Sequence, residues 1–294
     1  MEAGEGADHA EVQELSEAAF ALGPALDAQE DIATLVPCGE PASPDDIERT
    51  VAAIWDHPDL GDADLAHFAY RRADVLFQAR SDLDGALAVL TEALARMTSA
   101  VPRAALEAHR AAMLANAGRP LLALAAADVV TVTDDPHVRV ALANTRSTAL
   151  LSVGRCDEAI LAAHDGVAAQ ADLPLWQARR GLAGHLVNEA HALAYSGRYA
   201  AARALVEPAA ARARAAGALA GWVWFEVVLG EIARDTGRGH EAVEHFRTAA
   251  EAAEGAGQGA AAVWALVGVA QGLLLVGQAD AAEEALLQAD AAGD

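Results

Sequence analysis

The sequence predicts an all-α fold in which helical hairpins stack into a solenoid. Of its 294 residues, 54% are hydrophobic but only 4% aromatic, and about a quarter are alanine, the strongest helix former. A glycine or serine recurs every 36 to 43 residues from position 81 onward, with an alanine five positions later. The one strand-like run, Val129 to Thr133, has no partner run, so we interpret it as a helix end or a connection.

Residues 1–43 are predicted to be an acidic N-terminal helix pair followed by a proline-rich linker. The pair spans residues 10–35 and is interrupted at Gly23-Pro24, and its candidate core residues are Leu15, Phe20, Leu22, Leu26, Ile32 and Leu35. Residues 1–60 contain fifteen Asp or Glu and a single Arg49. We interpret this excess as a solvated acidic face, with an acidic arm for a partner as the alternative.

Residues 44–294 are predicted to form the repeat array. Ser43-Pro44 supplies an N-cap and a first-turn proline, so helix resumes near Asp45, and Asp135-Pro136 and Pro174 mark later helix starts. The turn phrases are Ser81 to Ala86, Gly118 to Ala123, Gly154 to Ala159, Gly197 to Ala202, Gly237 to Ala242 and Gly277 to Ala282, with an upstream copy at Gly23 to Ala28.

Each turn glycine is expected to adopt positive φ just past a helix end, and Ser81 is the exception in residue type. The alanine after the turn lets the second helix cross the first at close range. Seven positions before the turn the residues are again small, except for Asp74; they are Ser16, Ala111, Ser147, Ala190, Gly230 and Ala270. Hairpins that bury their apolar stripes only by stacking predict a right-handed superhelix with a concave inner face.

One copy of the repeat resembles the tetratricopeptide signature; it contains Leu229, Gly230, Ala233, Gly237, Ala242, Phe246 and Ala249. Residues 80–294 also resemble the sensor region of LuxR-type large ATP-binding, maltose-regulator-like bacterial transcriptional regulators. That resemblance rests on the GRxxEA-type turns, on Trp222 to Gly230 leading into GRGHEAVEHFRTAAEAAEGAG, and on ALVGVAQGLLLVGQADAAEEALLQAD. It implies helical repeats that link a nucleotide-switch ATPase to a helix-turn-helix. Because neither flanking domain is in the sequence, we expect a fragment, a truncated product or a free-standing relative.

Charge and composition exclude several classes of function. All 20 basic residues are arginine, so mechanisms that need a lysine amine, including the phosphate-binding P-loop, are excluded. A net charge of −23 opposes direct nucleic-acid binding. Cys38 and Cys156 suggest neither a disulfide framework nor a zinc site. The apolar run Val263 to Val276 is too short to span a bilayer and the N-terminus lacks an apolar core, so we expect a cytoplasmic protein.

Three local patterns are weak evidence for chemistry. The five-residue spacing of His240 and His245 in HEAVEH separates the imidazoles on a helix, whereas a zinc protease motif needs four. His185 and Glu189 are correctly spaced to share a ligand, but we favour packing. GAGQGA at 255–260 follows a predicted helix and not a strand, so we interpret it as a turn. We therefore predict no enzyme activity and no cofactor.

Candidate binding residues follow from the repeat family, in which the first helix of each pair lines the concave groove. Counting from the turns gives Arg71, Gln78, Asn144, Thr148, His191, Trp224, Glu231, Arg234, Trp264 and Gln271. The alternative for the two tryptophans is that they fill core space. We predict that the groove binds a protein partner or a small-molecule effector as part of a LuxR-type regulator, and the alternative is a stand-alone adaptor for protein partners. Because the chain is negatively charged, a basic or apolar peptide is the expected ligand. A homo-oligomer is a further possible assembly.

Overall fold

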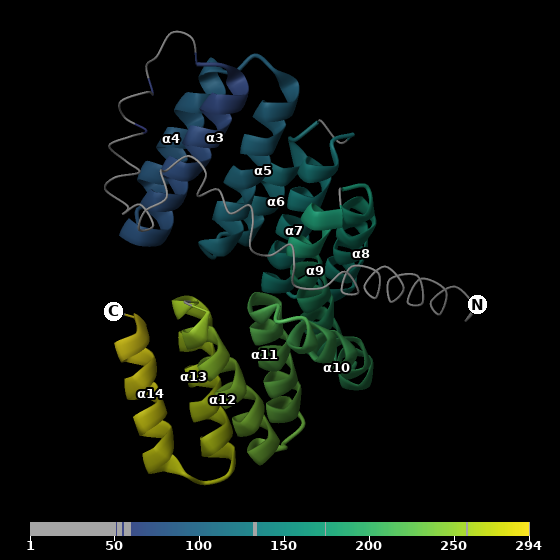
Figure 1. Cartoon of the computed structure of the whole chain (residues 1–294), viewed down its shortest axis with the longest axis vertical. Helices are drawn as coiled ribbons and strands as arrows, with labels where there is room; N and C mark the ends of the chain where they lie inside the picture. Colours follow the sequence, from purple (N-terminus) through teal and green to yellow (C-terminus); the bar gives the residue numbers. More distant parts are fainter. Residues whose placement is uncertain are drawn as a thin grey trace, which may run out of the picture. The chain divides into compact units, whose positions relative to one another are not determined.

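The computed structural model describes residues 51, 55, 60–131, 134–173, 175–256 and 258–293, and in these residues the chain is helical without a strand (Figure 1). The predicted segment 1–43 and the helix start near Asp45 lie outside the described residues. No helix in the described part combines the length and apolarity needed to cross a bilayer. The elements are α3 Asp62–Asp74, η3 Val75–Ala79, α4 Leu83–Arg96, α5 Ala100–Asn116, α6 Pro120–Asp128, α7 Pro136–Ser152, α8 Cys156–Ala171, α9 Leu175–Tyr195, α10 Tyr199–Ala215, α11 Leu219–Asp235, α12 Gly239–Gly255, α13 Gly259–Leu275 and α14 Ala279–Gly293.

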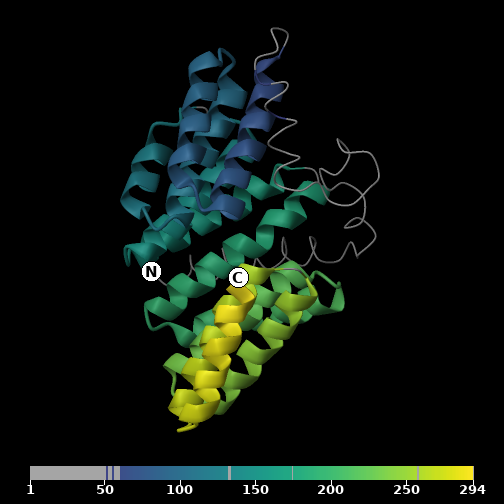
Figure 2. The same ribbon diagram turned by 90° about the vertical axis from the view of Figure 1, so that its left-hand side faces the viewer.

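The described residues fall into two compact units, one ending at Ala178 and one running from Arg179 onward, so the boundary lies within α9. We call them the N-terminal and the C-terminal unit. The first helices of the hairpins are α3, α5, α7, α9, α11 and α13, and each is followed by its second helix. In the C-terminal unit, α11 to α14 lie side by side in chain order (Figures 1 and 2). The all-α helical-repeat prediction is confirmed.

The turn glycines adopt the left-handed backbone that their positions predict. Their φ values are +70° at Gly118, +75° at Gly154, +78° at Gly197, +75° at Gly237 and +79° at Gly277. After each turn the next N–H donates back to a carbonyl five residues earlier, as from Arg238 to Ala233 at 2.8 Å. This bond closes the helix end in the manner of a Schellman motif. The turns are therefore fixed by backbone conformation.

Ser81 occupies the same turn position with φ of +53°, the only positive φ at a non-glycine among the described residues. Here the following N–H, from Asp82, bonds to the carbonyl of Leu76, six residues earlier. The π-helical stretch η3 accounts for the extra residue, because a π-turn inserts one residue into a helix. Positions in α3 counted back from Ser81 therefore shift by one.

That shift explains the exception at Asp74. The position equivalent to the small residues of the other repeats is Ala73, which is fully buried, and not Asp74. The other described members of the set, Ala111, Ser147, Ala190, Gly230 and Ala270, are also buried. The count that placed Asp74 at this position was wrong because the sequence VLFQA gives no sign of a π-turn.

The alanines that follow the turns are buried. Ala86, Ala123, Ala159, Ala202 and Ala242 are 0% exposed and Ala282 is 2% exposed.

Asp135 caps α7 by accepting bonds from the N–H groups of His137 and Val138, at 2.9 and 3.1 Å, as Asp135-Pro136 predicts. Val129 follows the last residue of α6, so the strand-like run begins as a helix end. Thr133 and Pro174 lie outside the described residues.

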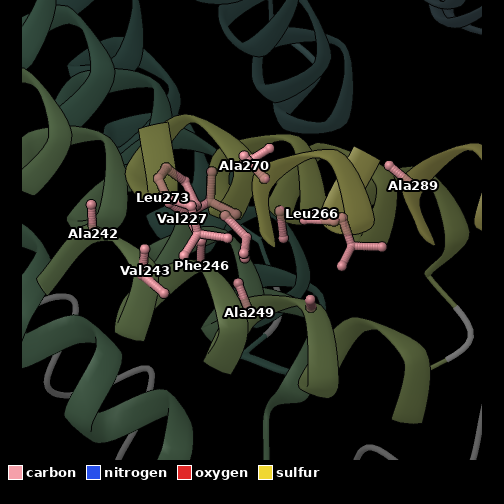
Figure 3. Packing of buried hydrophobic residues seen from close by; sticks show 14 of the residues in the cluster. Val227, Ala242, Val243, Phe246, Ala249, Leu266, Ala270, Leu273 and Ala289 are labelled. Carbon is pink, nitrogen blue, oxygen red and sulfur yellow. The ribbon is translucent and has the colours of Figure 1, made fainter. Parts of the chain in front are cut away.

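Phe246 belongs to the largest described core cluster of the C-terminal unit (Figure 3). Its ring is fully buried and lies against Gly230 of α11 and Gly268 of α13. A Cβ at Gly230 would come within 2.9 Å of the ring, and one at Gly268 would overlap it more deeply. The two glycines therefore make room for one phenylalanine, which explains why this copy matches the tetratricopeptide pattern well.

Candidate functional site

His191, Glu231 and Gln271 occupy one equivalent position on three successive first helices. Each lies six residues before its turn glycine, at Gly197, Gly237 and Gly277. They belong to α9, α11 and α13, all within the C-terminal unit. Because the turns are spaced equally, the hairpins stack with these side chains on the same side. The repeat thus places polar groups next to one another although they are 40 residues apart in sequence.

Glu231 is the centre of this set and is only 3% exposed. The indole Nε1–H of Trp264 donates to Glu231 Oε1 at 3.2 Å. His191 Nε2 lies 3.1 Å from Glu231 Oε2, which is ion-pair distance, although neither atom meets the angles of a hydrogen bond. A buried carboxylate is stable only when such partners replace water. Glu231 therefore joins three first helices.

The ionised form of Glu231 is favoured despite its burial. Burial by itself would raise the pKa of the carboxyl group. The contact with His191, the hydrogen bond from Trp264 and the charge of Arg234 act in the opposite direction and together hold the pKa below its ordinary value. The face consequently contains a fixed negative charge close beneath its surface.

Arg234 links α11 to α13 one turn beyond Glu231. Its Nη1 donates to Gln271 Oε1 at 2.6 Å, and its Nε donates to Asp235 Oδ1 at 2.8 Å. Partial burial alone would lower the pKa of the guanidinium, but Asp235 and Glu231 outweigh burial and raise it. The Arg234 charge is thus balanced locally by Asp235.

Two tryptophans and a tyrosine add aromatic surface to the same face. Trp224 and Trp264 meet edge to face, with ring centroids 6.4 Å apart and an interplanar angle of 65°. Trp224 also packs against the apolar core, whereas Trp264 is 52% exposed. Tyr195, which the sequence analysis missed, stacks on His191 at 5.6 Å. We call His191, Trp224, Glu231, Arg234, Trp264 and Gln271 the ladder.

The other four predicted residues lie in the N-terminal unit. Asn144 and Thr148 are on α7 and Arg71 is on α3. Gln78 is in η3, and its side chain is outside the described set. The π-turn makes Tyr70 and Asp74, and not Arg71, the equivalents of Asn144 and Thr148. Tyr70 and Asp74 both contact His109 of α5, with ring centroids 4.0 Å apart and a 3.4 Å Oδ1–Nε2 distance, respectively.

Other polar groups of the C-terminal unit are paired with neighbours or buried. His245 of the HEAVEH segment places Nδ1 2.7 Å from Glu226 Oε2, and Glu226 also accepts the Trp222 Nε1–H at 2.9 Å. His185 and Glu189 are each 1% exposed, and burial lowers the pKa of His185 to about 4. Within the described residues, no group of three or more His, Cys, Asp or Glu side chains is arranged to hold a metal ion.

Comparison with known proteins identifies the fold and no family. No family model matches the chain, and no curated protein matches it significantly. Among solved structures, the crystal structure of a Rap protein complexed with competence and sporulation factor is similar, with a TM-score of 0.63 and 16% identity. The match covers 96% of this chain and 77% of that one. The chain therefore has a tetratricopeptide-like helical-repeat fold.

Proposed function

We propose that the chain is a non-enzymatic binding module that holds a protein partner on the first-helix face of its C-terminal unit. The observation that carries the proposal is the ladder, which fixes polar and aromatic side chains from three first helices on one face. Tyr195, Trp264 and Gln271 in this region are exposed. Aromatic and arginine side chains at fixed positions are the groups that contribute most to protein interfaces.

The fixed geometry supports binding more than catalysis. Glu231 and Arg234 are engaged with neighbouring side chains, so the ladder offers a preformed surface. Preformed surfaces lose less conformational entropy when they bind. The similar Rap protein is itself in a complex with a factor, and this supports the expectation that a fold of this type receives a partner.

We further propose that the module regulates transcription within, or together with, a LuxR-type regulator. The support is the resemblance of residues 80–294 to the sensor region of those regulators. Occupancy of the face would favour one conformation of the associated regulator over another. The alternative function is a stand-alone adaptor for protein partners. The identity of the bound partner distinguishes the adaptor from the regulator.

The test places a photo-crosslinking amino acid at Gln271 of the full chain. The matched control carries it at Arg247, which is also exposed but lies on the second helix α12. After irradiation in an extract of the native cells, mass spectrometry should find one or two proteins attached at position 271 and absent at 247. Transcription proteins would support the regulator, whereas an enzyme complex or secretion machinery would support the adaptor. The same proteins at both positions, or none at 271, would contradict binding on this face.

A further inference from the structure

Trp264 combines an exposed ring with a buried anchor. About half of its surface is in solvent, yet its only polar atom donates to Glu231, which is 3% exposed. The hydrogen bond therefore holds the indole in place and leaves carbon atoms of the ring facing outward. A large apolar ring held in this way is a surface available to a partner.

Trp224 fixes the second side of this surface. Its ring meets that of Trp264 at 65°, so the two planes form a corner. Trp224 packs on the cluster that contains Val227 and Phe246, and also on the cluster that contains Val223. Because the core holds Trp224 and the carboxylate holds Trp264, the corner is formed before any ligand arrives.

The electrostatics of the corner favour a cation. A carboxylate that accepts the indole N–H increases the electron density over that ring, which strengthens attraction for positive charge on the ring face. Next to the corner, the two carboxylates of Glu231 and Asp235 outnumber the one guanidinium of Arg234, which pairs with Asp235 and donates to Gln271. His191 of α9 contacts the Glu231 carboxylate. The chain as a whole carries a net charge of −23, which favours association with a positively charged partner.

Other tryptophans of this chain already hold arginines. Arg72 and Arg96 each lie 5.4 Å from the ring centroid of Trp55, and Arg214 lies 5.4 Å from that of Trp222. No cation from the described part of the chain stacks on Trp224 or Trp264. Trp222 and Trp224 are two residues apart on α11, but only the ring of Trp222 stacks with an arginine of the described chain. The rings of Trp224 and Trp264 are therefore available to a cation from a partner.

We propose that the corner of Trp224 and Trp264, backed by Glu231, receives an arginine or lysine side chain of the protein partner. This inference rests on the proposed function. We call the arginine or lysine side chain that the corner receives the anchor. The cation would lie on the exposed face of Trp264, with its attraction to the ring and to the carboxylate acting together. A single cation–π contact is weak, so one anchor gives weak binding that a longer segment of the partner strengthens.

The test titrates the full, isotope-labelled chain with a blocked glycine peptide that contains one arginine, and with the same peptide containing citrulline. Citrulline keeps the shape of arginine and removes its charge. The indole N–H resonance of Trp264, assigned from Trp264→Phe, should move with the arginine peptide and respond about tenfold more weakly to the citrulline peptide. Glu231→Gln should weaken the response several-fold, whereas Glu251→Gln on the second helix α12 should leave it unchanged.

Several outcomes would overturn the anchor. Equal responses to the two peptides would show that charge is not recognised, and a shift at Trp222 in place of Trp264 would locate the cation elsewhere. Sedimentation supplies a further check: loss of a dimer in Trp264→Ala would show that a second copy covers the indole. If the crosslink from position 271 captures a partner while the arginine peptide has no effect, only the anchor fails. If both fail, the proposed function fails with it.

Discussion

The two units of the molecule are built from the same hairpin but differ in regularity. In the C-terminal unit, α11, α12 and α13 each contain 17 residues and the turn glycines are equally spaced. In the N-terminal unit the first turn carries Ser81 after a π-turn, and α6 has only nine residues. Leu121 and Leu122 on α6 are 69% and 56% exposed. The regular unit aligns equivalent side chains into a ladder, whereas in the irregular unit the π-turn shifts the register of α3 by one residue.

The largest expected effect comes from overfilling the core of the regular unit. Gly268→Ala should lower the free energy of unfolding by about 3 kcal/mol, because the new methyl group overlaps the buried ring of Phe246. Urea denaturation of the variant measures the loss. Phe246→Leu in the same chain should recover part of it, since the smaller side chain makes room. Equal losses with and without Phe246→Leu would contradict the packing described for this core.

Acid should weaken the C-terminal unit through His185. The pKa of His185 is lowered to about 4 in the folded chain by burial, whereas the unfolded value is about 6.5, so the unfolded state binds the proton more readily. The stability contributed by neutral His185 is therefore complete above pH 6.5 and is lost as the pH falls toward 4. Between pH 7 and pH 5 the loss should be about 2 kcal/mol.

Urea unfolding at a series of pH values checks the role of His185. His185→Leu should remove most of the slope between pH 7 and pH 5, because leucine fills the site without a titrating group. The exposed His240 supplies the control, since His240→Gln should leave the slope in place. A slope that survives in His185→Leu but disappears in His240→Gln would contradict the assignment.

A smaller effect is expected at the irregular turn. Ser81→Gly should raise the free energy of unfolding by about 0.5–1 kcal/mol, because serine is strained at φ of +53° and glycine is not. Gly154→Ser is the reverse change in the same unit and should cost a similar amount; a Cβ there meets open space, so only the backbone is tested. Thermal unfolding should show a higher midpoint for Ser81→Gly and a lower one for Gly154→Ser. Midpoints that move in the same direction would contradict the strain assigned to Ser81.

The sequence predicted the hairpins because their constraints are local. A glycine with positive φ and an alanine at a helix crossing are each dictated by one residue, and both recur at a fixed distance. No residue type in the sequence indicates the π-turn before Ser81. Counting back from Ser81 therefore selected Arg71, whereas Tyr70 occupies the equivalent position. Six of the ten candidate residues form the ladder, but the contact of His191 with Glu231 depends on the distance between repeats, which no single repeat encodes. Tyr195 lies four residues after His191, and that helical spacing was the available signal.

The most direct test of the central claim, that the regular unit joins its first helices through Glu231, is a double-mutant cycle between His191 and Glu231. The unfolding free energies of His191→Ala, Glu231→Gln and the double variant are compared with that of the original chain at pH 7. Because the two side chains lie 3.1 Å apart, we predict a favourable coupling of about 1 kcal/mol or more. Additive effects within about 0.3 kcal/mol would contradict the ladder.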